Sequence, residues 1–181
     1  MTDEARSLVF EAPTWGWIGL IASAQGLRVL SLPRQTEQAA WQALGRRHRE
    51  ATLAPNDPLL CEAARQVKAF LAGALREFSL VLDLRGHTAF ELAVWNTIRR
   101  IPYSQTRTYS WVADQVGGGR GAAQAVGAAV GANPIPIVIP CHRVIGADGS
   151  LHGFAGGLQM KARLLALESG QGHFDVAMAQ E

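Results

Sequence analysis

Apolar and polar positions in the first half of the chain predict a small α/β unit. Apolar runs at residues 17–22 and 27–32 are separated by Ser23-Ala24-Gln25-Gly26, a pattern typical of a β-hairpin. Apolar periodicity predicts helices over residues 35–49 and 59–75, the second preceded by a capping Asp57 and by Pro58, which suits a first helical turn. A further strand is predicted over residues 79–84.

The pattern becomes mostly helical in the second half. Thr88-Ala89-Phe90-Glu91 has the form of a capping box, and it opens a helix that Pro102-Tyr103 ends. The apolar residues predicted to share one face of this helix are Phe90, Val94, Ile98 and Ile101.

Two short helices joined by a glycine-rich turn come next and predict a helix-turn-helix. Thr108 would cap a helix over residues 109–116, Gly117-Gly118-Gly119 would break it, and a second helix would cover residues 121–131. Alanine and glycine dominate this second helix, so it suits close backbone approach to a partner rather than reading of base edges; a tightly packed internal helix is the alternative. The glycines do not form G-x-G-x-x-G, which excludes a dinucleotide site of that type.

The rest of the chain is an extended segment followed by a final helix. Prolines at 134, 136 and 140 stiffen the segment that leads from Asn133 to Cys141, and the final helix is predicted over residues 158–168. We therefore expect an N-terminal α/β domain over residues 1–84 and a mostly α-helical C-terminal domain over residues 85–181, which carries the helix-turn-helix and the Pro-Cys-His-Arg segment.

Composition narrows the class of protein. A hydrophobic content of 48% in 181 residues is enough for a substantial core. The N-terminus lacks the apolar stretch of a signal peptide, prolines interrupt the longest apolar stretch, and the two cysteines form no paired motif, so we expect a cytoplasmic protein without a membrane segment. Residues 85–168 carry eight basic and four acidic side chains, and this excess of +4 suits a polyanionic partner or an ordinary basic surface.

Cys141-His142-Arg143-Val144 is the segment most indicative of chemistry. A thiolate is the competent form of a cysteine nucleophile, and neighbouring cationic groups lower the pKa of the thiol. Side chains of adjacent residues diverge, so we expect a water molecule to link His142 to Cys141, with a carboxylate such as Glu168 orienting the far side of the ring. A buried structural cysteine beside a surface histidine is the alternative interpretation of these residues alone.

The context of this segment resembles the O6-alkylguanine-DNA alkyltransferases, also called methylated-DNA–protein-cysteine methyltransferases. Pro140-Cys141-His142-Arg143-Val144 is similar to the active-site signature of that family, and the resemblance covers about residues 83–170, whereas the first half matches only in its α/β pattern. The other similar segments are Ala89-Phe90, Val94-Trp95, Ile101-Pro102-Tyr103, Thr108-Tyr109, Ala125-Val126-Gly127, Ala132-Asn133-Pro134, Gly153-Phe154-Ala155-Gly156-Gly157, Lys161 and Leu164-Leu165-Ala166-Leu167-Glu168.

The resemblance implies repair of duplex DNA that carries O6-alkylguanine and leaves open whether O4-alkylthymine is a further substrate. The nucleotide would be extruded from the duplex, and the alkyl group would move irreversibly to the protein in a single turnover. Cys141 would accept it, His142 and Glu168 would activate the thiol through water, and Asn133 would brace the segment that precedes Cys141. Tyr109 would crowd the target phosphate and donate a hydrogen bond to the flipped guanine.

The resemblance also implies DNA-binding and base-pocket residues. Tyr109, Ser110, Arg120, Gln124 and Arg143 would bind nucleic acid. The base pocket would be formed by Val144, Phe154 and Ala155, with backbone groups of Cys141, Val144 and Ala155 binding the edge of the base. We expect a monomer with no cofactor and no bound metal.

The chain departs from the family pattern at several positions. Gln124 stands where the family commonly places an arginine that fills the gap left by the extruded base, and Arg120 lies about one helical turn earlier. His87 is an insertion, while Glu91 and Ser104 replace the usual glutamine and glycine. These departures concern DNA affinity and base flipping more than the transfer chemistry.

Three other functions are weighed against this one. A non-catalytic lesion sensor would lack the acceptor cysteine, which is present here as Cys141. A transcriptional regulator of the bifunctional type would carry a cysteine-rich zinc module, which is missing. In a Cys-His hydrolase the histidine contacts the cysteine directly, but the histidine closest to Cys141 in sequence is adjacent to it.

Overall fold

The computed structural model describes residues 4–45 and 50–170. The chain divides into two compact units: the first comprises Met1–Arg85 with Pro134–Pro136, and the second comprises Gly86–Asn133 and the residues from Ile137 onward. From the sequence we expected the boundary between the domains to fall between residues 84 and 85. We did not expect Pro134–Pro136, in the proline-rich segment, to belong to the first unit. The two units are described in turn.

The first unit is built on a four-stranded sheet with the order β3-β2-β1-β4. Its strands are β1 (Arg6–Ala12), β2 (Gly16–Ser23), β3 (Gly26–Leu30) and β4 (Thr52–Leu53). The first three pair antiparallel, and β4 runs parallel to β1. The predicted hairpin is confirmed as β2 and β3, whereas β1 was not predicted because its polar residues interrupt the apolar alternation. The prediction of a strand over residues 79–84 is wrong. This segment forms a single β-bridge, between Leu27 and Leu82, and Val81 is 68% exposed.

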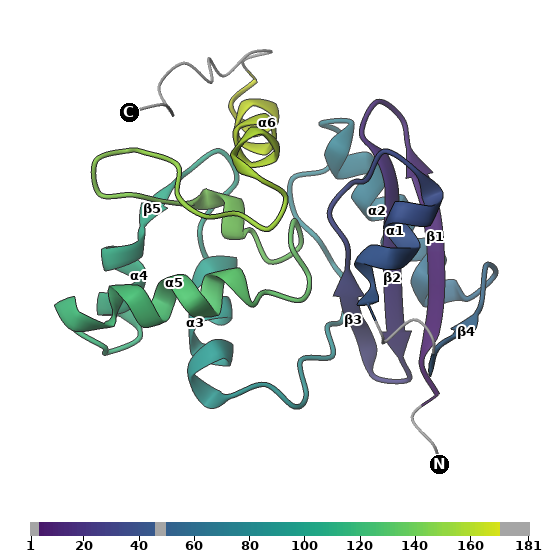
Figure 1. Ribbon diagram of the computed structural model, residues 1–181, viewed down its shortest axis with the longest axis horizontal. Coiled ribbons are helices and arrows are strands. Elements are labelled where there is room, and N and C mark those ends of the chain that lie inside the picture. Colours follow the sequence, from purple (N-terminus) through teal and green to yellow (C-terminus); the bar gives the residue numbers. More distant parts are fainter. Residues whose placement is uncertain (1–3, 46–49, 171–181) are drawn as a thin grey trace. The chain divides into compact units, whose positions relative to one another are not determined.

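Two helices complete the first unit. The helix α1 (Glu37–Ala43) begins at the N-cap Thr36, and α2 (Pro58–Leu71) begins at Asp57, whose side chain accepts a hydrogen bond from the Leu60 amide. In Figure 1, α1 lies in front of the strands and α2 lies behind them, and both helices contact β1 and β2. The helix predicted over residues 59–75 ends early, before Gly73 at φ 73°, and residues 46–49 of the other predicted helix lie outside the described residues.

The second unit begins with α3 (Ala89–Arg99), which Thr88 caps. The predicted capping box is confirmed, because the Thr88 side chain accepts from the Glu91 amide while the Glu91 carboxylate accepts from the Thr88 amide. Trp95 is fully buried and donates its indole N–H to the Ala129 carbonyl at 2.8 Å. The predicted apolar face is correct except for Phe90, which is 37% exposed because it stands in the first turn, ahead of the packed part of the helix.

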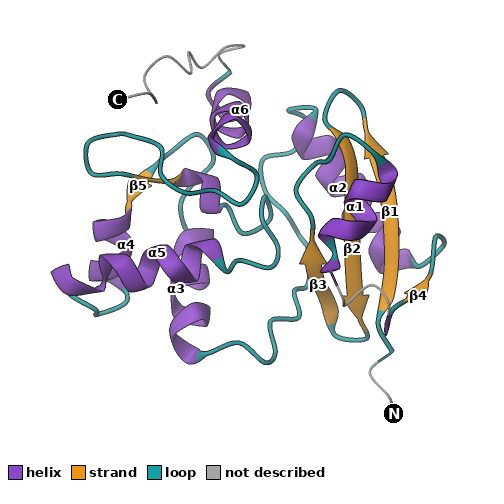
Figure 2. Cartoon of the chain, viewed as in Figure 1, coloured by secondary structure: helices purple, strands orange, loops and turns teal. Residues whose placement is uncertain are grey.

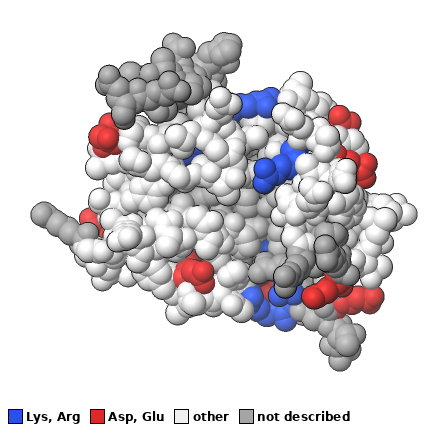
Figure 3. Space-filling model, viewed as in Figure 1, with Lys and Arg blue, Asp and Glu red and all other residues white. Residues whose placement is uncertain are grey.

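The next helices are α4 (Tyr109–Gln115) and α5 (Ala123–Gly131), with a 3₁₀ turn, η2 (Arg120–Ala122), ahead of α5. The helix α5 buries Val126, Ala129 and Val130, whereas Gln124, Ala125 and Ala128 are exposed and Gly127 is half-buried. A Cβ atom added at Gly127 would meet nothing within 4 Å, so the small-residue face of α5 is open and the packed-internal-helix alternative is wrong. Figure 3 shows an uncharged surface over this helix.

A short parallel pair, β5 (Arg107–Thr108) and β6 (Val144–Ile145), joins the start of α4 to the segment that follows Cys141 (Figure 2). Cys141 opens the 3₁₀ turn η3 (Cys141–Arg143), and the last described helix is α6 (Leu158–Ser169). This pairing places Tyr109, one residue after β5, close to η3. Within the described ranges, no helix has the length and apolar character needed to cross a membrane.

Candidate active site around Cys141

Cys141 is buried at the end of a restrained segment. It is 4% exposed, and the Asn133 side chain braces the preceding residues by donating to the Ile139 carbonyl at 2.8 Å. Ile137 in the same segment has φ 75°, a conformation that a β-branched side chain adopts only when its surroundings enforce it. The thiol is therefore presented by a chain segment held in one path.

The surroundings of Cys141 affect its ionisation in opposite directions. Burial raises the pKa of the thiol from 9.0 to about 11, because it disfavours the charged form. A hydrogen bond from Asn133, the charge of Lys161 and the backbone amides of Cys141 and His142 act to lower the pKa. The resting side chain is therefore a thiol at neutral pH, and it needs a base to become a nucleophile.

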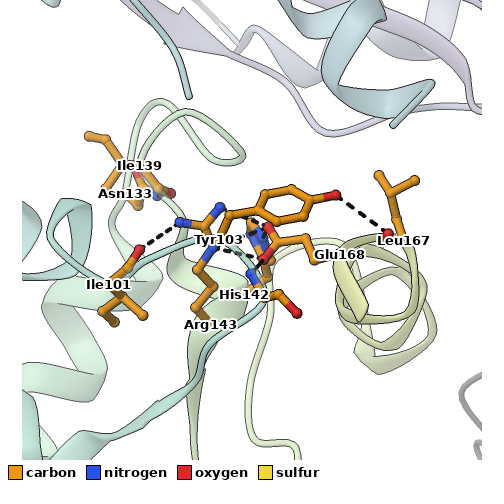
Figure 4. A network of polar contacts seen from close by, with 9 residues as sticks. Ile101, Tyr103, Asn133, Ile139, His142, Arg143, Leu167 and Glu168 are labelled. Carbon is orange, nitrogen blue, oxygen red and sulfur yellow. Dashed lines mark hydrogen bonds and ion pairs between the residues drawn. The ribbon is translucent and has the colours of Figure 1, made fainter. Parts of the chain in front are cut away.

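His142, Arg143 and Glu168 form a buried network (Figure 4). Glu168 Oε1 lies 2.6 Å from His142 Nε2, and Arg143 binds both carboxylate oxygens through Nε and donates to Oε1 through Nη2 at 2.9 Å. Arg143 also donates to the Ile101 carbonyl at 2.7 Å and lies over the Tyr103 ring. Glu168 thus fixes the imidazole through Nε2 and leaves Nδ1 as the ring nitrogen for any contact with the thiol.

The pKa values within this network agree with an anionic carboxylate and a neutral imidazole. Burial raises the pKa of Glu168, but hydrogen bonds from His142 and Arg143 outweigh it and lower the pKa from 4.5 to about 2. Burial lowers the pKa of His142, with the bond to Glu168 opposing that shift. A neutral imidazole oriented by a carboxylate can accept a proton.

Ser104 is the third residue that binds Glu168, and it does so through its backbone. Its amide donates to Glu168 Oε2 at 2.9 Å, and its φ of 64° lies in the left-handed region that favours glycine. The side chain of Ser104 is exposed, but the backbone conformation of this residue directs its amide toward the Glu168 carboxylate.

Lys161 is the site residue that the sequence reasoning did not assign. It is fully buried, its Nζ donates to the His152 carbonyl at 2.9 Å, and it lies 5.7 Å from the centre of the Tyr109 ring. Burial lowers its pKa from 10.5 to about 8, while the charge of Cys141 raises it. A lysine on an otherwise buried face of α6 was the available signal, since lysine is rarely buried without a role.

An open cleft of about 460 Å³ lies beside Tyr109 in the second unit. Tyr109 from α4, Gln124 from α5 and His152 are among its lining residues. Burial raises the pKa of the Tyr109 hydroxyl, and the charge of Cys141 raises it further. The cleft therefore combines an aromatic hydroxyl close to Cys141 with the polar side chain of Gln124.

The other residues expected at the site are placed as follows. Ser110 is exposed in the first turn of α4, and Val144 is buried in β6. Phe154 is half-buried and Ala155 is exposed, but neither lines the cleft. Arg120 begins η2, and its side chain lies outside the described part of the structure.

Arg143 is placed differently from the expectation that it binds nucleic acid. Its side chain is 7% exposed, and its guanidinium is occupied by Glu168 and the Ile101 carbonyl. It therefore serves the internal network in this structure. In the described residues, no group of three or more His, Cys, Asp or Glu side chains is arranged to hold a metal ion.

Comparison with known proteins gives one consistent family. The family model described as 6-O-methylguanine DNA methyltransferase, DNA binding domain, matches residues 89–170. A methylated-DNA–protein-cysteine methyltransferase of Mycobacterium tuberculosis H37Rv is 48% identical over 124 residues, which cover 68% of this chain and 74% of that protein. An inducible protein of the same name from Bacillus subtilis is 39% identical over 153 residues, 84% of each chain.

Solved structures extend the similarity to nearly the whole chain. The Mycobacterium tuberculosis O6-methylguanine methyltransferase matches with a TM-score of 0.75 and 40% identity, covering 96% of this chain and 98% of that one. The same enzyme in complex with DNA matches with a TM-score of 0.77 and 40% identity, covering 97% and 98%. On its sequence, its fold and these relatives, this chain belongs to the methylated-DNA–protein-cysteine methyltransferase family.

Proposed function

We propose that this protein repairs DNA by moving the alkyl group of O6-alkylguanine onto the sulfur of Cys141, once per molecule. The observation that carries the proposal is the placement of Cys141 in η3, immediately before a histidine that a buried carboxylate orients at 2.6 Å. The names of the relatives, including an O6-methylguanine methyltransferase in complex with DNA, support the same activity.

Transfer begins with loss of the thiol proton from Cys141. His142 takes this proton at Nδ1 through a water molecule, and the resulting imidazolium is stabilised by Glu168. The thiolate then attacks the alkyl carbon in line with the bond to O6. A carbon–sulfur bond forms, the carbon–oxygen bond breaks, and the electron pair leaves with guanine.

Guanine is a better leaving group when it receives a hydrogen bond or a proton as the bond to O6 breaks. Tyr109 is suited to that role, because it lines the cleft and its hydroxyl lies close enough to Cys141 for the charge of the sulfur to raise the pKa of the hydroxyl. The product is a thioether at Cys141, which has no easy hydrolytic exit. One molecule of protein therefore removes one alkyl group.

The target atom lies inside the base stack, so the nucleotide must leave the duplex before the sulfur can reach it. We assign α4 and α5 to a helix-turn-helix that holds the DNA, with the small-residue face of α5 allowing close backbone approach. Gln124, exposed on this helix, is the residue that fills the space of the extruded base. Arg143 acts as a positioning residue for Glu168 rather than as a DNA contact.

The test is intact-protein mass spectrometry after mixing with a duplex that carries O6-methylguanine. The expected result is a gain of one methyl group, located on the peptide that contains Cys141 and lost in Cys141→Ala. Cys61→Ala is the matched control, because Cys61 is the exposed cysteine of the first unit and should not affect transfer. Repeated turnover, or methylation of Cys61, contradicts the proposal.

A further inference from the structure

A cavity of about 220 Å³ lies in the second unit, apart from the cleft already described. Three parts of the chain form this α6 cavity: Ser104 from the turn before β5, Ile145 and Leu151 from β6 and the loop after it, and Leu165 with Glu168 from α6. None of its described lining residues also lines the cleft. A ligand in the α6 cavity would therefore leave the cleft free.

The burial of the lining residues shows how the α6 cavity is built. Ser104 and Ser169 are exposed and stand at its mouth, Ile145 and Leu151 are half-buried, and Leu165 is 7% exposed. The walls are thus largely aliphatic, and the opening lies between the end of α6 and the turn that carries Ser104.

Charge in the α6 cavity is already compensated. Among its described lining residues Glu168 is the ionised one, and its carboxylate accepts hydrogen bonds from His142, Arg143 and the Ser104 amide. A cation entering the cavity would find this counter-charge paired, and an anion would be repelled by it. Either ion would also lose its hydration between aliphatic walls, which costs free energy. The cavity therefore suits a neutral ligand.

The volume limits the size of that ligand. A cavity of about 150 Å³ lined by apolar side chains is large enough to hold benzene. The α6 cavity is larger, at about 220 Å³, so a substituted aromatic ring or two fused rings would fit.

The α6 cavity also borders the hydrogen bond that holds Glu168 from the Ser104 side. Ser104 has φ 64°, and its amide donates to Glu168 Oε2 at 2.9 Å. The cavity has this shape with the bond in place, so a ligand that fits it binds this arrangement better than one in which Ser104 relaxes. Binding therefore shifts the population toward the arrangement with the intact bond.

We propose that the α6 cavity binds a small, neutral aromatic molecule, and that its occupancy supports alkyl transfer by keeping the Ser104 amide on Glu168. The second part rests on the proposed function, because its readout is methyl transfer to Cys141. The first part is independent of that function, because binding is measured without DNA.

Binding is tested with indole as the probe, on the whole chain with its isoleucine and leucine methyl groups labelled with carbon-13. We expect the methyl resonances of Ile145, Leu151 and Leu165 to shift and to saturate as indole is added, because these side chains line the cavity. Benzoate, an aromatic ring that carries a negative charge, should leave the same resonances unchanged.

A substitution in the wall tests the site directly. Leu151→Ala removes apolar contact and should weaken indole binding by about tenfold. Leu92→Ala is the matched control, because Leu92 is a half-buried leucine of α3 that does not line the cavity, and it should keep the wild-type dissociation constant. Should Leu151→Ala fail to fold, the methyl shifts of the wild type still decide where indole binds.

The effect on transfer is tested with two substitutions of Ser104. Threonine is β-branched and adopts the left-handed conformation at a higher cost than serine, whereas glycine adopts it freely. Ser104→Thr should therefore take the methyl group from an O6-methylguanine duplex more slowly than wild type, and saturating indole should restore part of that rate. Indole should change the rate of Ser104→Gly little, because the bond to Glu168 is already favoured there.

Three results would decide against these inferences. Methyl shifts centred on other residues, or reproduced by benzoate, would overturn the site or its ligand class. Equal effects of indole on the rates of Ser104→Thr and Ser104→Gly would overturn the effect on transfer. A wild-type protein that binds indole at the expected methyl groups but transfers no methyl group to Cys141 would instead refute the proposed function.

Discussion

Replacing Glu168 with glutamine tests whether the buried network stabilises the second unit. Glu168 is 4% exposed, and its two oxygens accept hydrogen bonds from His142, Arg143 and the Ser104 amide. Glutamine has one acceptor oxygen and one NH2 group, so in either orientation of its side-chain amide the NH2 group would face N–H donors. The Arg143 guanidinium would also lose its counter-charge. Removing one partner of a buried ion pair costs about 3–5 kcal/mol.

The pKa of Glu168 gives an independent magnitude. The difference between 4.5 and about 2 corresponds to about 3 kcal/mol, because each pH unit is worth about 1.4 kcal/mol at 25 °C. The pKa of the folded state lies below that of the unfolded state, so this stabilisation is fully present above about pH 5 and is lost as the pH falls toward 2. We therefore expect Glu168→Gln to be destabilised by about 3 kcal/mol at pH 7, and the difference from wild type to shrink through that window.

The assay is urea unfolding followed by circular dichroism at several pH values. With a slope of about 2 kcal/mol per molar urea, the midpoint of the affected transition should fall by about 1–2 M. Glu62→Gln is the control: Glu62 also has a pKa lowered to about 2, through hydrogen bonds from Arg65 and Gln66, but it lies on the exposed surface, where the pair is screened and should leave the midpoint nearly unchanged. Equal midpoints for Glu168→Gln and wild type at pH 7, or a loss that does not shrink with acid, would refute the reasoning.

Three further predictions concern other parts of the second unit. Gln124→Arg should raise affinity for duplex DNA and speed repair in a duplex, while the reaction with free O6-benzylguanine, which needs no base flipping, should stay unchanged. The measurement is the second-order rate of each of these two reactions, and equal changes in both rates would refute the assignment of Gln124. Lys161→Met removes a cation that lowers the pKa of the Cys141 thiol, so the rise of transfer rate with pH should move to higher pH, as a pH–rate profile would show. Thr88→Ala removes the cap of α3 and should cost about 1 kcal/mol in urea unfolding, whereas Thr106→Ala, outside any helix, should cost less.

Local sequence signals predicted the elements that they directly encode. The turn between β2 and β3 and the caps at Asp57, Thr88 and Thr108 all rest on short-range chemistry, and all are present. The segment around residues 79–84 was predicted as a strand from its apolar residues, but pairing depends on a neighbouring strand, and Leu82 alone finds one. The strand β1 was missed for the opposite reason, since its pairing with β2 overrides a weak pattern.

The candidate site was predictable to the extent that it follows from the family resemblance. Cys141, His142 and Glu168 came from segments similar to that family, and the structure brings the last two into contact. The inward position of Arg143 could not be derived from the sequence, because it depends on which group a distant helix presents. Spacing along the chain does not specify such contacts.

The left-handed backbone at Ser104 has a consequence for mutational tolerance. Exposed positions ordinarily accept most substitutions, but here any residue other than glycine carries a conformational cost of about 1 kcal/mol or more, and β-branched residues carry the most. Because the Ser104 amide reaches Glu168 only in this conformation, a substitution that relaxes the backbone would also release the carboxylate. A surface position is thereby as restricted as one in the core, and a substitution scan that ranks sites by burial alone would overlook it.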